Sequence, residues 1–150
     1  MFRMLYVSGA SRPMGERDID AILAVSRDNN ARAGITGMLL WADGVFIQIL
    51  EGETGAVRRL AARIEQDPRH RNFMVMIEQK VAARAFSDWS MGFRQLDASG
   101  AVDQSLFQVS HAALASRIFD HDGGLFLDTV LAFGRDFMAE HQASPGAARA

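Results

Sequence analysis

The chain has 150 residues, of which 49% are hydrophobic and 23% charged, a balance that suits one globular domain with a full core. Its net charge of −2 gives no basic field for nucleic acid or an anionic membrane, and the absence of cysteine excludes disulfides, thiolate metal sites and a cysteine nucleophile. No apolar run approaches the roughly 20 residues of a membrane span, and the N-terminus turns polar too soon for a signal peptide, so we expect a cytoplasmic protein.

The first third of the chain predicts a strand, a loop and a helix. Residues 2–8 alternate as a strand, which places Tyr6 on the same face as Met4 and Ser8. Residues 9–15 contain the Gly, Ser and Pro of a loop. Residues 16–31 predict a helix, whose inward stripe is Ile19, Ile22, Leu23, Ser26 and then Asn29 or Asn30. The asparagine pair also suits a helix end, since Gly34 follows it.

Two apolar runs, residues 35–41 and 45–50, flank an Asp-Gly pair and predict a β-hairpin. In both runs the residues that would point to either face of a strand are apolar. This indicates strands in the middle of a sheet that is covered on both faces. The exception is Gln48, which shares a face with Phe46 and Leu50. A buried amide without partners costs on the order of 1–3 kcal/mol, so Gln48 needs polar neighbours. These are either the backbone of its own sheet or a polar ligand.

The middle of the chain predicts a second helix and two more strands. Thr54 is the expected N-cap of a helix that ends before Pro68. Residues 73–78 and 89–95 predict strands, and residues 81–87 connect them in a form that the pattern does not define. The predicted order is therefore βαββαββ, an α+β fold with two helices on one face of the sheet.

The last part of the chain predicts two further helices. Residues 105–119 and 125–141 have a broad apolar arc, and a Gly-Gly pair separates them. Because the other face of the sheet is also apolar, we expect these helices to cover it, to contact a partner subunit, or both. Residues 142–150 predict a disordered tail.

Common catalytic and metal-binding motifs are absent from the sequence. The four histidines form no HxxxH or HExxH pair, and we find no Walker lysine, no GxGxxG after a strand and no GxSxG elbow. We therefore expect neither a metal site nor hydrolytic machinery.

Neutral polar side chains instead converge on one predicted pocket between the first helix and the sheet. They are Tyr6, Ser26, Asn30 and Gln48. Amides and a phenol are suited to reading the edge of a heterocycle that has both donors and acceptors. Charged groups at the end of the second helix suit a phosphate-bearing tail, namely Arg63, Asp67, Arg69 and His70. Arg63 and Asp67 are spaced i, i+4 and are equally compatible with a simple surface ion pair.

Four stretches of the sequence resemble the BLUF family of blue-light sensors that use FAD. They are LYVSGAS, SRDNNARAGITGMLLWADGVFIQILEG, DPRHRN and FSDWSMGF. The similarity covers residues 1–97 and implies a flavin-binding domain with a ferredoxin-like sheet. In such a domain the isoalloxazine of non-covalently bound FAD lies between the first two helices. Residues 98–141 would then form a helical extension.

The resemblance implies photochemical roles for two residues. Tyr6, the single tyrosine of the chain, matches the residue that donates an electron and then a proton to the excited flavin. Gln48 matches the glutamine that bridges this tyrosine and the flavin N5/O4 edge. Its amide is taken to rotate or tautomerise, which shifts the flavin absorption to the red.

The resemblance also implies a set of cofactor contacts and a signal relay. The cofactor contacts are Ile22, Ser26, Asn29, Asn30, Gln48, Arg63, Ile64, Asp67, Arg69 and His70. Trp89, Ser90 and Met91 match the relay toward the last strand. One departure is Trp41, where the family often has tyrosine, and we expect it to be structural.

We therefore expect a non-enzymatic blue-light photoreceptor that binds FAD. Too few residues follow the sensor for an enzymatic effector, so its signal would pass to a separate partner of phosphodiesterase or transcriptional-regulator type, or through a homo-oligomer. Two other readings stay open. The stretch Ser8–Arg12 could cradle an anion in a small acyl-phosphate hydrolase. A light-insensitive adaptor on the same fold would bind partners only.

Overall fold

The computed structural model describes residues 1–42, 44–87 and 90–95, and the account below is restricted to them. The elements run in the order β1 (Phe2–Ala10), α1 (Glu16–Ala33), β2 (Thr36–Ala42), β3 (Val45–Gly52), α2 (Thr54–Gln66), β4 (His70–Lys80) and β5 (Gly92–Gln95). This confirms the predicted βαββαββ order. The helices predicted within residues 105–141 and the predicted tail lie outside the described residues.

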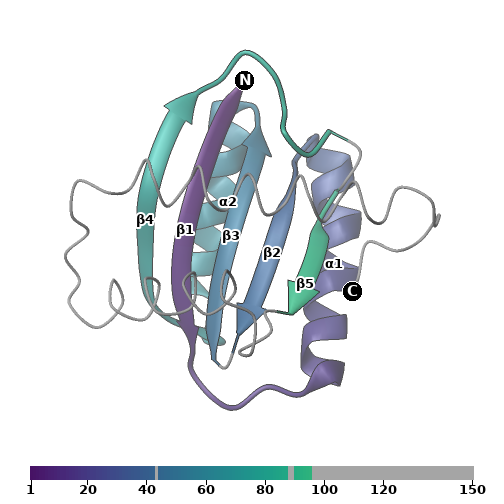
Figure 1. Ribbon diagram of the computed structural model, residues 1–150, viewed down its shortest axis with the longest axis vertical. Coiled ribbons are helices and arrows are strands. Elements are labelled where there is room, and N and C mark those ends of the chain that lie inside the picture. Colours follow the sequence, from purple (N-terminus) through teal and green to yellow (C-terminus); the bar gives the residue numbers. More distant parts are fainter. Residues whose placement is uncertain (43, 88–89, 96–150) are drawn as a thin grey trace.

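The five strands form one sheet in the order β4-β1-β3-β2-β5. Strands β1, β2, β3 and β4 pair antiparallel, whereas β5 pairs parallel with β2 at the edge. Both helices lie on the same side of the sheet, α2 behind β1 and β3 and α1 toward β2 and β5 (Figure 1). Neither helix is long and apolar enough to cross a membrane.

The pairing of β1 with β3, the second strand of the central hairpin, brings the two predicted photoactive residues together. β2 and β3 are joined by a two-residue connection, in which Gly44 takes a φ of 85°, a conformation that glycine adopts without steric cost. The antiparallel register of β1 and β3 then places Tyr6 directly opposite Gln48. Side chains that face each other across two strands share a face of the sheet, so the two polar groups meet on the helix side.

Both faces of the central strands are buried, as their apolar alternation predicts. Tyr6, Phe46 and Leu50 pack toward the helices, and the Leu5 and Ile49 side chains on the opposite face are fully buried as well. Two helical residues complete the core on the helix side: Leu23 of α1 and Val57 of α2 are 2% and 0% exposed. The cavity described below is built into this core.

The structure corrects several predicted boundaries. The N-cap of α2 is Glu53 and not Thr54, because the Glu53 carboxylate accepts bonds from the amides of Gly55 and Ala56 at 2.9 Å each. β1 continues to Ala10 and β4 begins at His70, since those two residues pair with each other. β5 begins only at Gly92, three residues later than predicted.

A buried carboxylate attaches the β4–β5 connection to the sheet. Glu51 of β3 is fully buried and accepts two hydrogen bonds from the Arg3 guanidinium, at 2.9 and 2.8 Å. Its oxygens also accept from the backbone amides of Ala85 and Phe86. Arg84 donates to the Glu51 carbonyl at 2.9 Å. The connection, which the sequence leaves undefined, is therefore held to the sheet by the Glu51 carboxylate and the Arg84 guanidinium.

Replacing Glu51 by alanine should destabilise the fold by about 3–5 kcal/mol, because it leaves the Arg3 guanidinium buried without its counter-ion. Urea unfolding monitored by circular dichroism measures the change. Arg32→Ala is the matched control, since the Arg32–Asp28 pair is exposed and worth less than about 1 kcal/mol. Equal losses in the two variants would contradict the structural role of Glu51.

Candidate functional site

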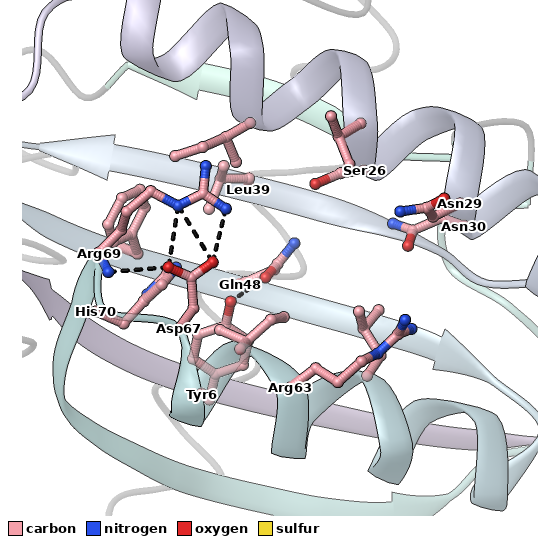
Figure 2. A pocket seen from close by; sticks show the side chains of 15 residues that line it. Tyr6, Ser26, Asn29, Asn30, Leu39, Gln48, Arg63, Asp67, Arg69 and His70 are labelled. Carbon is pink, nitrogen blue, oxygen red and sulfur yellow. Dashed lines mark hydrogen bonds and ion pairs between the residues drawn. The ribbon is translucent and has the colours of Figure 1, made fainter.

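A cavity opens between α1 and α2 over the helix face of the sheet, with side chains from both helices pointing toward each other across it (Figure 2). It is lined by Tyr6, Ile22, Val25, Ser26, Asn29, Asn30, Leu39, Phe46, Gln48, Leu60, Arg63, Ile64, Asp67, Arg69 and His70. All ten predicted cofactor contacts and Tyr6 thus line one cavity. The structure brings these residues together, and their roles toward a ligand remain predictions.

The floor of the cavity is a buried hydrogen-bond chain from β1 through β3 to the residue before β5. The Tyr6 hydroxyl donates to Gln48 Oε1 (Figure 2), and Gln48 Nε2 donates to Met91 Sδ at 3.1 Å. Tyr6, Gln48 and Met91 are 1%, 6% and 1% exposed. The polar partners that the buried Gln48 amide requires are therefore the side chains of Tyr6 and Met91. They are not backbone groups of the sheet, which was one of the two expected kinds of partner. In the described part of the chain, every buried side-chain nitrogen and oxygen has a hydrogen-bond partner.

Helix α1 supplies the wall on the β5 side. Asn29 and Asn30 lie in the last full turn of the helix, because α1 continues to Ala33 and ends at Gly34, where φ is 67°. Asn30 is buried and donates from Nδ2 to the Ser90 carbonyl at 3.1 Å, whereas Asn29 is exposed. Asn30 therefore both lines the cavity and contacts the segment that leads into β5. The asparagines do not cap the helix.

The mouth of the cavity carries a charged cluster at the end of α2. The Asp67 carboxylate accepts two bonds from Arg69 Nε, at 3.0 and 3.1 Å, and one from Arg69 Nη2 at 2.6 Å (Figure 2). This arginine holds the pKa of the Asp67 carboxyl below its usual value. Arg63 is exposed at the cavity rim, so the i, i+4 pair with Asp67 that the sequence permits is replaced by the Asp67–Arg69 pair.

Burial keeps two titratable groups of the cavity neutral. Desolvation raises the pKa of the Tyr6 phenol far above its usual value, and the nearby Asp67 charge adds to this. Desolvation lowers the pKa of the His70 imidazole to about 4, although the Asp67 charge opposes the shift. His70 Nδ1 lies 2.7 Å from Ser8 Oγ. At neutral pH, Tyr6 therefore retains its proton and His70 is uncharged.

Several residues of the site were not singled out by the sequence. Phe73 of β4 stacks on Tyr6 with ring centroids 4.5 Å apart, and Phe46 lies 4.6 Å from the His70 ring. Arg27 of α1 donates to the Met91 carbonyl at 2.9 Å. Alternation places Phe46 on the same face as Gln48, but it gives no signal for the contact of Phe46 with His70. The contact of Arg27 has no such signal, because it joins residues 64 positions apart.

The predicted relay is described in part. Met91 touches Gln48 and Ser90 accepts from Asn30, whereas Trp89 lies outside the described residues. Trp41 is 8% exposed and its ring lies 4.6 Å from Phe46, so it packs beside the cavity without lining it. Among the residues described, no three His, Asp or Glu side chains gather as a metal-binding set.

Comparison with known proteins gives consistent results. The sequence model of the BLUF family, "Sensors of blue-light using FAD", matches residues 1–92. Photoactivated adenylate cyclase subunit beta of Euglena gracilis is 39% identical over 89 residues, which are 59% of this chain and 10% of the relative. The chain thus spans about a tenth of the length of the curated relatives that it matches.

Two solved structures share the fold, and each is 28% identical to this chain. The dark state of BlrB, a BLUF protein, superimposes with a TM-score of 0.66 and 28% identity, over 87% of this chain and 95% of that one. BlrP1 of Klebsiella pneumoniae, solved with FMN and cyclic diGMP, superimposes with a TM-score of 0.62 and 28% identity, over 76% of this chain and 34% of that one. The match over residues 1–92 is more than half of the sequence, and the chain belongs to the BLUF family of blue-light sensors that use FAD.

Proposed function

We propose that the chain senses blue light by binding FAD non-covalently in the cavity between α1 and α2. Light absorption would be converted into a change in the hydrogen bonds of Gln48, which reaches β5 through Met91. The observation that carries the proposal is the buried chain Tyr6–Gln48–Met91 on the cavity floor. The amides and the phenol on this floor suit a flavin edge and are poor acid–base catalysts, since amides do not titrate and the phenol keeps its proton.

The cavity suits a planar, polar ring system that carries an anionic tail. Ile22 of α1 and Ile64 of α2 face the cavity as apolar walls, and Asn29, Asn30 and Gln48 offer amide donors and acceptors. Arg63 and Arg69 lie at the mouth, where they suit the phosphates of a dinucleotide. A flavin ring has apolar faces and polar edges, so the residues present match it.

FAD, when bound, absorbs blue light and becomes a strong oxidant. The Tyr6 phenol is the electron donor on the cavity floor, and its hydroxyl proton already lies on the hydrogen bond to Gln48 Oε1. Loss of an electron makes a phenol far more acidic, so this proton would leave along that bond and pass by way of Gln48 to the group that took the electron, and both would return to Tyr6 in the dark. The raised pKa of Tyr6 ensures that the proton is present before illumination.

Gln48 can convert the loss of the Tyr6 proton into a change of partners. Its amide carries an acceptor on one side and a donor on the other, so one rotation exchanges the two at fixed positions. In the dark arrangement Oε1 accepts from Tyr6 and Nε2 donates to Met91. After rotation Nε2 would face Tyr6 and Oε1 would face the thioether, which cannot donate. The contact with Met91 weakens, and β5 receives the signal.

The output would be passed to a separate partner or to another copy of the chain. The relatives are named as adenylate cyclase subunits, and BlrP1 was solved with cyclic diGMP, so we propose an effector of cyclic-nucleotide metabolism. No catalytic activity is proposed for residues 1–92. The acyl-phosphate hydrolase reading is disfavoured, because Ser8, Gly9 and Ala10 belong to β1 and Ser8 is fully buried.

The proposal predicts that the FAD-loaded protein shows a small, reversible red shift of its absorption after blue light. Tyr6→Phe and Gln48→Ala should each bind FAD and lose the shift, since they remove the donor and the amide. Absorption spectra before and after illumination measure this. Trp41→Phe is the control and should keep the shift, because its ring does not line the cavity.

Two other outcomes would overturn the proposal in part or in whole. FAD binding without a shift in the native protein would overturn the roles of Tyr6 and Gln48. A protein that refuses added FAD would overturn the sensor itself and favour the adaptor reading.

The buried His70 makes the stability of the cavity depend on pH. Its folded pKa of about 4 lies below its ordinary value of 6.5, so between these pH values the unfolded chain binds a proton that the folded chain excludes. Stability is therefore complete above about pH 6.5 and falls as the pH drops toward 4. The pKa of Asp67 is lowered in the folded chain from its ordinary value of 3.8, so its protonation reduces the stability only below about that pH.

The free energy of unfolding should accordingly fall by about 3 kcal/mol between pH 6.5 and pH 4 through His70 alone. Urea unfolding at a fixed FAD concentration across this range measures the slope. His70→Asn should flatten the slope, because it removes the titrating group. Identical slopes for the variant and the native protein would show that His70 is not the group responsible.

A further inference from the structure

Helix α1 holds the two residues that lead into β5. β5 is a four-residue edge strand, and its ladder with β2 begins at Gly92. Ser90 and Met91 precede the ladder, and their carbonyls accept hydrogen bonds from two α1 side chains. Asn30 Nδ2 donates to the Ser90 carbonyl at 3.1 Å, and Arg27 Nε donates to the Met91 carbonyl at 2.9 Å.

The two donors form a clamp with a defined geometry. Arg27 and Asn30 are spaced i, i+3, so they lie on the same face of α1 and reach two successive carbonyls. The Arg27 bond is charge-assisted and partly buried, which makes it the stronger of the two. Because it ends on the backbone of Met91, it limits where the side chain of that residue can lie.

The clamp acts on the same residue that contacts the photoactive amide. Met91 Sδ accepts from Gln48 Nε2 at 3.1 Å, and Met91 is 1% exposed. The backbone of Met91 is thus fixed by α1 on one side, while its side chain is bonded to β3 on the other. A small displacement of the backbone would change the S···N distance directly.

We propose that Arg27 is a positioning residue that holds Met91 against Gln48 and thereby sets the lifetime of the illuminated state. The inference rests on the proposed light response of Gln48. Arg27 stabilises the dark arrangement, in which the Gln48–Met91 bond is present. Without the clamp, the return to this arrangement loses driving force and slows.

The test compares Arg27→Gln with the native FAD-loaded protein. We expect the red shift to remain and its thermal decay in the dark to slow about tenfold, a factor that corresponds to about 1.4 kcal/mol. Arg32→Gln is the matched control on the same helix, because its partner Asp28 is exposed and neither residue lines the cavity. Its decay should stay within about twofold of the native rate.

A second readout follows the clamp in the dark and needs no photochemistry. Methyl-¹³C labelling of the eight methionines gives one NMR signal for each, and Met91→Leu identifies the signal of Met91. In Arg27→Gln the Met91 signal should move while the other signals keep their positions. Arg27→Lys keeps the positive charge and is the smaller change, so it should move the Met91 signal by a smaller amount. It replaces Arg27→Gln in the test if that variant does not fold.

The double variant decides whether Arg27 acts through Met91. In the Met91→Leu background the sulfur acceptor is gone, so adding Arg27→Gln should change the decay no further. An unchanged decay and an unmoved Met91 signal in Arg27→Gln would overturn the inference, as would an equal slowing in both backgrounds. Absence of any red shift in the native protein would instead overturn the proposed function, while the NMR readout would still test the clamp.

Discussion

The architecture depends on how one buried amide is satisfied. Gln48 sits on a central strand among apolar side chains, and its two polar ends have two partners, the Tyr6 hydroxyl and the Met91 sulfur. The first partner comes from strand register and the second from a residue 43 positions away. A thioether is a weak acceptor, so the arrangement is stable but easily exchanged. This imbalance makes the amide suitable as a switch.

The segment between β4 and β5 is fixed at two places by different means. In the first part of the segment, the amides of Ala85 and Phe86 donate to the Glu51 carboxylate, and Arg84 donates to the Glu51 carbonyl. At its end, Arg27 and Asn30 bind the residues before Gly92 to α1. The second anchor holds the backbone of Met91, whose sulfur accepts from the Gln48 amide.

The sequence predicts the floor of the site better than its edges. Period-two alternation places Tyr6 and Gln48 on inward faces, and the Asp-Gly turn fixes the hairpin, so the βαββαββ order and the shared cavity follow. Contacts between distant residues escape such patterns. In the sequence, Glu51 has the pattern of an ordinary residue near a strand end. Its bonds to Arg3 and to the β4–β5 connection depend on the tertiary structure. Glu53, and not Thr54, is the N-cap of α2, because its carboxylate accepts hydrogen bonds from two backbone amides at once.

In the proposed light response, the Gln48 amide changes its hydrogen bonds on illumination. A light-minus-dark infrared difference spectrum of protein with ¹³C-labelled glutamine side-chain carbonyls tests it directly, with Gln48→Ala to assign the band. We expect an isotope-sensitive carbonyl band that shifts with light and is absent from the variant. A red shift of the flavin absorption without any change in a labelled glutamine band would contradict it.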